Sequence, residues 1–586
     1  MSGYQTLSLG LVGFVLGISW LYRWALPKPI PGIPYNKHAA SRLLGDLPDM
    51  QAYRSRGLSF RPWLGEIGRR HNSPVVQIFI APFLKPYIVL NDFWESYDIM
   101  YRRTKEFDRS KRNADTFGAI VPEHHISMTS FDPRFKSNKE LVKDLMTPGF
   151  LHNVVAPSLY NNAQTLVKLW QCKGEKAAGR PFDAKRDLNA TALDTLWTAA
   201  FGFSAGPCAL PAYINAVKQA CVQLPANKDE AVVFPTITLS EGMSCLVGSI
   251  GLLDRILGSP WPKLKMRLIA TFTSARGLLK RQRIFLSSTI IKCAERIEAH
   301  KGEVKAQCSM DYMVLREKNA AIKAGRQPIY DSARMRDELL GYMATGHETT
   351  ATTMNWIVKF LSDNEAQQSI LRDHLYSVFA AARAENRQPT VEEIITTPAP
   401  YLDAFVEEGL RYQHSVQINL RESIVDTVVL GHPVPKGTTI FMYTRGPSYL
   451  SPAFHVDESL RSKSSNDAKK RVGEWDEETI EQFEPLRWLK PKKDVASVGD
   501  LEFAPSFSGY DFDQQAGPTM PFGAGPRICF GRRFAYLSLR MYVAMIVWNL
   551  ELSPCPTDLN SYDVLDGAVS QPRQCYVRVH SANQSS

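Results

Sequence analysis

The sequence lacks the patterns that would indicate a disulfide scaffold, a zinc finger or a nucleic-acid-binding arm. Its nine cysteines are odd in number and irregularly spaced, and no two of them form a CxxC pair. This usage favours reduced thiols in a protein that faces the cytosol. The net charge of +10 is modest for 586 residues and is not gathered in one segment, so we expect no nucleic-acid partner.

The chain also contains no internal repeat, no long low-complexity tract and no alternating βαβ pattern. Apolar residues recur at spacings of three and four from Phe135 to Ala399, which predicts helices. Short β-rich pieces around two turn signals predict a hairpin over 423–444, and 534–550 reads as a buried helix. Together these features predict an α+β fold that is mostly α, with a small β-sheet region. The polar residues 461–478 indicate a surface insertion, to which we assign no structure.

The first residues are apolar and long enough to span a bilayer. Residues 7–26 read LSLGLVGFVLGISWLYRWAL, and no basic residue precedes Leu7, which favours a transmembrane anchor over the alternative, a cleaved signal peptide. Arg23 and Lys28 follow the run, so the positive-inside rule places the rest of the chain in the cytosol. We therefore expect an anchor over 1–26, a stiff proline-rich hinge over 27–34 and one domain over 35–586.

A second apolar stretch covers 242–257, but it is too short to cross a membrane. Asp254 and Arg255 interrupt it. A core helix is the favoured interpretation, and a loop that dips into the membrane is the alternative.

The segment PFGAGPRICFGRRF, residues 521–534, holds a single cysteine among glycines and arginines. A thiolate is the form of cysteine that binds metals, and nearby cations favour it, so Arg527, Arg532 and Arg533 are expected to stabilise the thiolate of Cys529. A helix that starts after the loop adds partial positive charge. The glycines let the backbone approach a flat group closely.

Other chemistries fit this loop poorly. Zinc needs several clustered ligands, a nucleophilic cysteine needs a local signature, and GAG at 523–525 lacks the third glycine of a dinucleotide fingerprint, since residue 528 is Ile. What remains is a lone thiolate as the axial ligand of haem iron.

Residues 522–531, FGAGPRICFG, resemble the FxxGxRxCxG loop of the cytochrome P-450 haem-thiolate monooxygenases. The resemblance implies the fold of that family, a helix-rich haem domain with a small β-sheet region. It assigns Cys529 as the axial iron ligand and places Phe522, Gly523, Arg527 and Gly531 at the haem. The anchor and the hinge resemble the microsomal branch, which implies a single-pass protein of the endoplasmic reticulum membrane.

The segment ATGHETT, residues 344–350, resembles the oxygen-activating helix of the same family. The resemblance assigns a proton relay to Glu348 and Thr349, because a carboxylate beside a hydroxyl can act as a general acid. Gly346 is expected to thin the helix where oxygen binds. Thr345 departs from the family pattern, which has Ala or Gly there.

Two further resemblances concern support of the cofactor. Glu408 and Arg411 match the ExxR motif, and Arg487 matches the arginine of a later loop, so the three are expected to form a buried structural triad. Cations for the haem propionates are expected at Arg527, at Arg421 and at Lys139, where FKSNK departs from the family's WxxxR.

The function implied by the resemblance is insertion of one oxygen atom from O2 into a hydrophobic organic substrate, in secondary metabolite biosynthesis. Electrons would come from NADPH through a separate flavoprotein reductase. Two alternatives remain: a haem-thiolate isomerase or dehydratase that needs no external reductant, and a haem-binding sensor.

Overall fold

The computed structural model describes residues 3–56, 59–202, 206, 208–300, 304–492 and 507–582, and for residues 3–10 it describes the backbone alone. The chain divides into two compact units. The sheet unit comprises Met1–Ser110, Ile418–Ile480 and Pro518–Pro526. The helical unit comprises Lys111–Gln417, Glu481–Gly517 and Arg527–Ser586.

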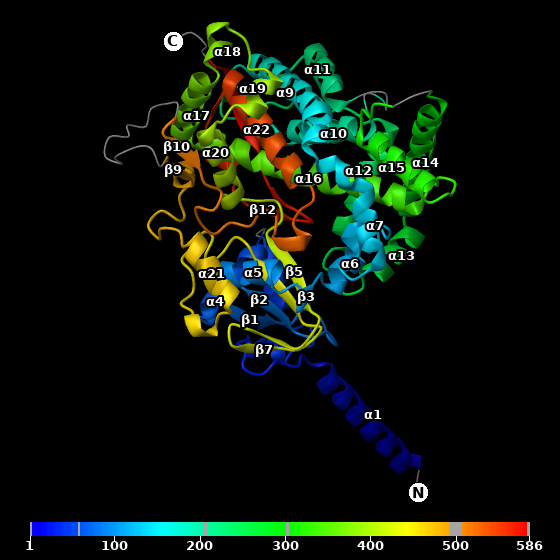
Figure 1. Cartoon of the computed structure of the whole chain (residues 1–586). Helices are drawn as coiled ribbons and strands as arrows, with labels where there is room; N and C mark the ends of the chain where they lie inside the picture. The colour runs from blue at the N-terminus through cyan, green and yellow to red at the C-terminus, as the bar shows by residue number, and fades with distance from the viewer. Residues whose placement is uncertain are drawn as a thin grey trace. The chain divides into compact units, whose positions relative to one another are not determined.

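The sheet unit is built around one five-stranded sheet with the order β1-β2-β8-β5-β3, which runs from blue to yellow in Figure 1. Strand β2 pairs with β8 in parallel, and the other neighbours are antiparallel. Its elements are α1 (Gly3–Ala25), α2 (Lys37–Ala40), α3 (Leu47–Ser55), α4 (Arg61–Arg70), β1 (Val75–Ile78), β2 (Tyr87–Leu90), α5 (Phe93–Tyr101), β3 (Phe107–Asp108), β5 (Ile418–Ser423), β6 (Thr427–Val429), β7 (His432–Val434), β8 (Thr439–Tyr443) and α21 (Lys463–Val472).

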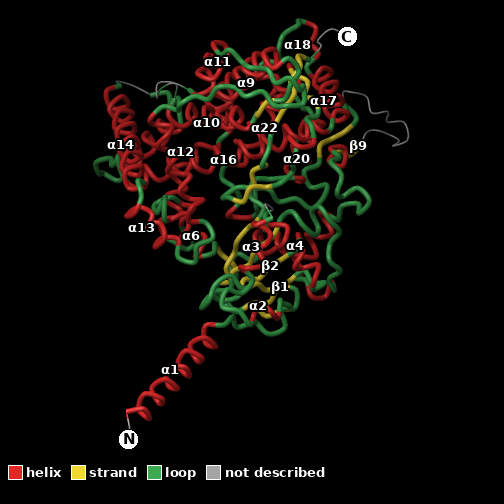
Figure 2. The backbone as a smooth tube through the Cα atoms, turned by 180° about the vertical axis from the view of Figure 1, so that it is seen from behind, coloured by secondary structure: helices red, strands yellow, loops and turns green. Residues whose placement is uncertain are grey.

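The helical unit contains the long central helix α16 and the helices packed on it, drawn in red in Figure 2. Its helices are α6 (Lys111–Gly118), α7 (Pro133–Val142), α8 (Pro148–Phe150), α9 (Ala156–Ala177), α10 (Lys185–Phe201), α11 (Ala209–Gln219), α12 (Glu241–Ile256), α13 (Pro262–Phe272), α14 (Ala275–Ala299), α15 (Ser309–Lys323), α16 (Ala333–Asp363), α17 (Glu365–Val378), α18 (Ala380–Ala384), α19 (Val391–Thr396), α20 (Pro400–Tyr412) and α22 (Arg532–Asn549).

Small antiparallel sheets complete the helical unit, in the orders β10-β9, β11-β14-β4 and β12-β13. Their strands are β4 (Phe182–Asp183), β9 (Leu489–Pro491), β10 (Tyr510–Phe512), β11 (Leu550–Ser553), β12 (Val564–Asp566), β13 (Ser570–Pro572) and β14 (Tyr576–Ser581). The expected mixture of many helices with little sheet is therefore confirmed.

The predicted elements that position the site are present. Helix α16 spans Ala333–Asp363 and contains the segment 344–350, and α22 spans Arg532–Asn549, close to the expected 534–550. The hairpin expected within 423–444 is β6–β7, which turns at Gly431 with φ +79°. The apolar stretch from residue 242 is α12, whose inner face buries Met243, Leu246 and Ile256, so the core-helix interpretation is correct.

Residues 461–478, to which no structure was assigned from the sequence, contain a helix. Helix α21 occupies Lys463–Val472, and its N-cap hydroxyl, that of Ser462, accepts a hydrogen bond from Ser465 N–H. The preceding Arg461 is buried and makes two hydrogen bonds to the carboxylate of Asp92, at 2.8 and 2.6 Å. This buried ion pair fixes the segment to the sheet unit, since an uncompensated guanidinium would be costly there.

At the N-terminus, α1 forms a helix over Gly3–Ala25 with exposed apolar side chains such as Leu11, Phe14 and Leu16. Within the part of the chain that the structure describes, no helix is both long and apolar enough to cross a membrane. The first residues of the predicted anchor, Met1 and Ser2 and the side chains of 3–10, lie outside that part.

The proline-rich segment that follows α1 has no helix or strand. The side-chain amide of Gln77 donates to the carbonyls of Ile30 and Ile33, at 2.9 and 2.7 Å, and Ile30 N–H donates back to that amide at 2.8 Å. The segment is thus fastened to strand β1 of the sheet unit.

Candidate active site

The cysteine loop carries the chain from the sheet unit into the helical unit. Gly523 and Gly525 both have φ +69°, a conformation that side chains disfavour. A Cβ on Gly525 would lie 2.1 Å from the carbonyl oxygen of Met100, so this position admits glycine alone. Gly531 is the N-cap of α22, and the loop therefore ends at a helix N-terminus, as expected.

The residue Cys529 is exposed, whereas Cys245, Cys293, Cys308 and Cys575 are buried. The surrounding protein desolvates the thiol and raises its pKa, and Gly531 N–H and Arg532 act in the opposite direction. Of the three arginines expected to stabilise the thiolate, Arg532 is the one with this effect.

The other two arginines have different roles. Arg527 donates to the carbonyl of Met128 at 2.7 Å, and Arg533 donates to the carbonyl of Met146 at 3.2 Å. Both side chains therefore fasten the loop to neighbouring segments of the helical unit. The expected effect of Arg527 and Arg533 on the thiol stays a prediction.

Arg527 and Lys139 lie near the same aromatic ring. The Arg527 guanidinium carbon is 4.2 Å and the Lys139 ammonium nitrogen is 5.5 Å from the ring centroid of Phe135. Burial and the charge of Arg527 lower the pKa of Lys139. Two cations held this close suit an anion, and with the thiol of Cys529 they provide the donor set that haem requires: one axial thiolate and cations for its propionates. The residues present therefore fit haem.

Three other predicted haem contacts, Phe522, Gly523 and Arg421, belong to the sheet unit. Arg421 lies in β5, is buried, and donates to the carbonyl of Leu420 at 2.9 Å. The Cβ position of Gly523 lies 3.5 Å from the Asn419 side chain in the same strand. Phe522 precedes this glycine and is partly buried. The structure thus brings Gly523 close to the strand that carries Arg421.

Glu348 and Thr349 lie in the middle of α16. The Glu348 carboxylate accepts a hydrogen bond from Gln571 Nε2 at 3.0 Å, and the Thr349 hydroxyl donates to the carbonyl of Thr345 at 2.6 Å. Burial and the negative charge of Asp254 raise the pKa of Glu348, and the bond from Gln571 lowers it. Glu348 is therefore a carboxyl group that can hold a proton.

Gly346 also has a packing role, and its expected role at the oxygen site stays a prediction. A Cβ on Gly346 would lie 2.9 Å from the side chain of Leu196. The missing side chain therefore allows α10 to pack closely against α16.

The predicted structural triad is present. Glu408 is fully buried and receives two hydrogen bonds from Arg411, at 2.8 and 2.7 Å. Arg487 Nε lies 3.3 Å from the same carboxylate. Two further donors complete the network: the indole N–H of Trp488 at 2.9 Å and the backbone N–H of Glu484 at 2.9 Å.

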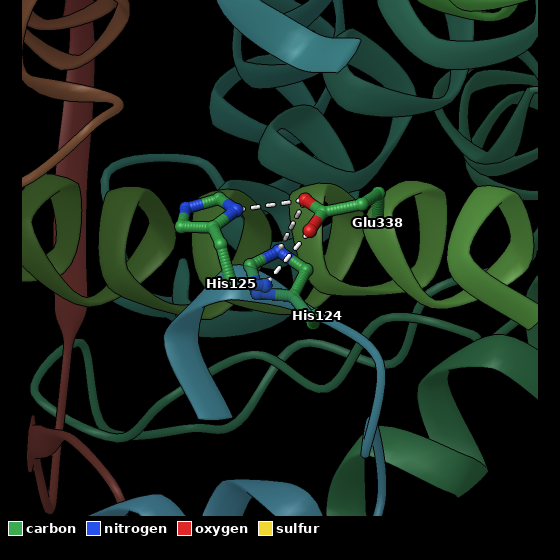
Figure 3. Close-up of side chains that lie close together, drawn as sticks. All are labelled: His124, His125 and Glu338. Carbon is green, nitrogen blue, oxygen red and sulfur yellow. Dashed lines mark hydrogen bonds and ion pairs between the residues drawn. The ribbon is translucent and has the colours of Figure 1, made fainter. Parts of the chain in front are cut away.

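One buried group was missed by the sequence reasoning. Figure 3 shows the rings of His124 and His125 turned toward the carboxylate of Glu338. Glu338 accepts from the backbone N–H and from the ring Nδ1 of His125, each at 2.7 Å, and His124 Nε2 lies 3.4 Å away. The ring of His125 also contacts Phe530, the residue after Cys529, with centroids 5.8 Å apart.

This group connects the segment before α7 to α16. The ring nitrogens of the two histidines and a carboxylate oxygen of Glu338 lie within 4.8 Å of one another, which is close enough to bind a metal ion. The Nδ1–Oε2 distance of 2.7 Å is however that of a direct hydrogen bond, so the contacts are explained without a metal. The paired histidines were visible in the sequence, but nothing local indicated a partner 213 residues away.

The comparisons with known proteins agree with this geometry. The family model described as cytochrome P-450 matches residues 251–449 and 475–579. Cytochrome P-450 monooxygenase GME11363 of Pestalotiopsis microspora is 37% identical over 586 residues, covering 98% of each chain. Cytochrome P-450 monooxygenase TRI13 of Fusarium sporotrichioides is 34% identical over 580 residues, covering 97% of this chain and 98% of its own.

A solved structure supports the fold. The crystal structure of a cytochrome P-450 (CYP102L1) superposes with a TM-score of 0.64 at 15% identity, covering 95% of this chain and all of the other.

Proposed function

Since this chain belongs to the cytochrome P-450 family, in which haem with an axial thiolate is the cofactor, we propose that it oxidises a hydrophobic product of fungal secondary metabolism. The enzyme is an oxidoreductase of the monooxygenase type. When bound, the haem iron activates O2, and the thiolate donates electron density that favours cleavage of the O–O bond. We propose the substrate class, the electron donor and the roles of the individual residues as follows.

The observation that carries the proposal is the loop around Cys529. It presents this exposed residue at the N-terminus of α22, and the cations Arg527 and Lys139 lie in the same unit. We assign Cys529 as the iron ligand and these two cations as partners of the propionates. Phe522, Gly523, Gly531 and Arg421 remain the proposed haem contacts along the rest of the loop and on β5.

The proton chemistry is assigned to Glu348 and Thr349. Glu348 holds a proton more readily than an ordinary glutamate, because burial disfavours its charged form. Thr349 Oγ lies on the next residue of the same helix and can pass a proton onward. Their role is to supply the protons that the reduction of O2 consumes, which is general acid catalysis.

The electron donor in this proposal is a separate NADPH-dependent flavoprotein reductase. The exposed Arg533 at the start of α22 gives the surface beside the cysteine loop a positive charge. Such a surface favours an acidic protein partner, and the attraction weakens as salt is added.

We place the enzyme on the endoplasmic reticulum membrane with its catalytic part in the cytosol. The exposed apolar side chains of α1 support this placement, since a helix of this kind is driven out of water. Carbonate extraction of microsomes that contain the full chain tests it: the protein is expected in the membrane pellet, and recovery in the supernatant would contradict the placement.

The function is tested by expressing the full chain with a reductase and comparing metabolites with and without NADPH. An oxygenated product that appears only when NADPH is present supports a monooxygenase. A product that forms without NADPH indicates the isomerase or dehydratase. If no product forms and added organic compounds cause no spectral shift, a haem-binding sensor is indicated.

A matched spectrum tests the assignment of the ligand. Cys529→Ser is expected to abolish the long-wavelength Soret band of the ferrous–carbonyl complex. Cys555→Ser, at a partly exposed cysteine, is expected to leave this band in place.

A further inference from the structure

The acid of the proposed relay is held from outside its own helix. Gln571 lies in strand β13 and donates its side-chain N–H to Glu348 Oε1 at 3.0 Å, across 223 residues of sequence. Among the described residues, this is the hydrogen bond that the structure gives the Glu348 carboxylate. The position of the carboxylate therefore depends on the β12–β13 hairpin.

The backbone around Gln571 is fixed on both sides. The carbonyl of Ser570 accepts a hydrogen bond from the indole of Trp356 at 2.8 Å, and Ser570 N–H donates to the carbonyl of Ser415 at 2.8 Å. Trp356 lies on α16, eight residues and about two turns after Glu348. A single helix therefore carries both the acid and an anchor for the strand that holds it.

The turn of the same hairpin is attached to α12. Asp254 Oδ1 accepts a hydrogen bond from Ala568 N–H at 2.6 Å. A Cβ on Gly567 would lie 3.0 Å from that carboxylate oxygen, so the contact is close. Asp254 thus fixes the turn and also adds a negative charge near Glu348.

We propose that Gln571 is a positioning residue for the acid Glu348, and that Asp254 supports it by holding the β12–β13 turn. The proposal rests on the relay assigned above and extends it. An amide is suited to this task because it can donate a hydrogen bond without adding a charge. A cation at the same place would hold Glu348 ionised, and an apolar residue would leave its orientation undetermined.

The first test is spectroscopic and needs neither substrate nor turnover. The C=O stretching band of protonated Glu348 is obtained as the infrared difference between wild type and Glu348→Gln at acidic pH. Gln571→Leu removes the donor at similar size and is expected to shift this band to higher frequency. The control Gln574→Leu is expected to leave the band unmoved, since the Gln574 amide donates to the carbonyl of Asp558. An unmoved band in Gln571→Leu overturns the proposal.

The second test measures how electrons are used when O2 is reduced without substrate. Two electrons from one NADPH and two protons convert O2 to hydrogen peroxide, whereas four electrons and four protons convert it to two water molecules. Gln571→Leu is expected to raise the ratio of peroxide to water about tenfold, because a misplaced acid delivers protons slowly. Gln571→Asn, whose amide is one methylene shorter, is expected to give an intermediate rise.

The outcomes distinguish a failure of the proposed relay from a failure of the positioning role of Gln571. If Glu348→Gln itself leaves the peroxide ratio unchanged, the proposed relay is wrong. If Glu348→Gln raises the ratio and neither Gln571 variant does, the relay holds and the positioning role of Gln571 is wrong. Gln571→Glu provides a check on the mechanism: its carboxyl donates only when protonated, so its peroxide ratio is expected to fall toward that of wild type as the pH is lowered.

Discussion

Glu408 and Glu348 are two glutamates of the same helical unit, and they differ in the charge of the groups that bind their carboxylates. Glu408 is fully buried and is bound by the guanidinium groups of Arg411 and Arg487. Glu348 is partly buried and is bound by the neutral amide of Gln571, with another carboxylate, Asp254, nearby.

This difference separates a structural carboxylate from a chemical one. A carboxylate compensated by cations fixes the geometry around it. A carboxyl group that is desolvated without a cation exchanges its proton more readily near neutral pH, which general acid catalysis requires. Both residues sit in helices, so the helix does not decide the role.

The largest effect is expected from Glu408→Ala. The change leaves the buried Arg411 guanidinium without its counter-charge and should cost about 3–5 kcal/mol of unfolding free energy. It is measured by urea unfolding together with the ferrous–carbonyl spectrum. Glu140→Ala is the control, because Glu140 forms an exposed pair with Lys143 at the same i,i+3 spacing. If both variants unfold at the wild-type midpoint, the structural reading of Glu408 is contradicted.

A smaller loss is expected from Trp488→Phe. The change keeps an aromatic ring and removes the indole N–H that donates to Glu408 at 2.9 Å. A hydrogen bond to a charged group contributes about 1.5–3 kcal/mol, so the unfolding midpoint should fall by less than in Glu408→Ala. Trp548→Phe tests for a size effect, since Trp548 is also buried. An equal loss in both would assign the cost to packing and not to the network around Glu408.

The comparison also shows how far the sequence predicted this site. The partners Glu408 and Arg411 are three residues apart on one helix, so their pairing could be inferred from spacing together with the family resemblance. Cys529 was identified in the same way, because its glycines and arginines are local. Gln571, by contrast, lies 223 residues from Glu348. No local pattern encodes such a pair, because tertiary packing of the hairpin against α16 creates it.

The same reason explains which parts of the fold the sequence did not predict. The helices α16 and α22 followed from apolar periodicity, which is a local property. Residues 461–478 are polar and were assigned no structure, because the bond between Arg461 and Asp92 joins residues 369 positions apart. Similarly, the hydrogen bonds of Arg527 and Arg533 to the carbonyls of Met128 and Met146 could not be inferred from the sequence around Cys529.

The smallest and most discriminating effect concerns the pH dependence of stability. The pKa of Glu348 is raised in the folded protein, since burial and Asp254 disfavour its charged form. A raised pKa means that its favourable contribution is complete below the unfolded pKa and is lost as the pH rises through the folded value. The side chain in Glu348→Gln is neutral at every pH, so this variant does not lose that stability as the pH rises. Its unfolding free energy, relative to wild type, should therefore increase as the pH rises through the folded pKa of Glu348.

Urea unfolding of Glu348→Gln and Glu408→Gln over this pH range compares the unfolding free energies of the two variants with that of wild type. Glu408→Gln is expected to be less stable than wild type at neutral pH, because a neutral amide leaves Arg411 and Arg487 uncompensated. The two variants should therefore differ from wild type with opposite signs at pH 8. If Glu348→Gln is instead destabilised there by a similar amount, Glu348 is a structural carboxylate like Glu408, and it is not the proton donor of the relay.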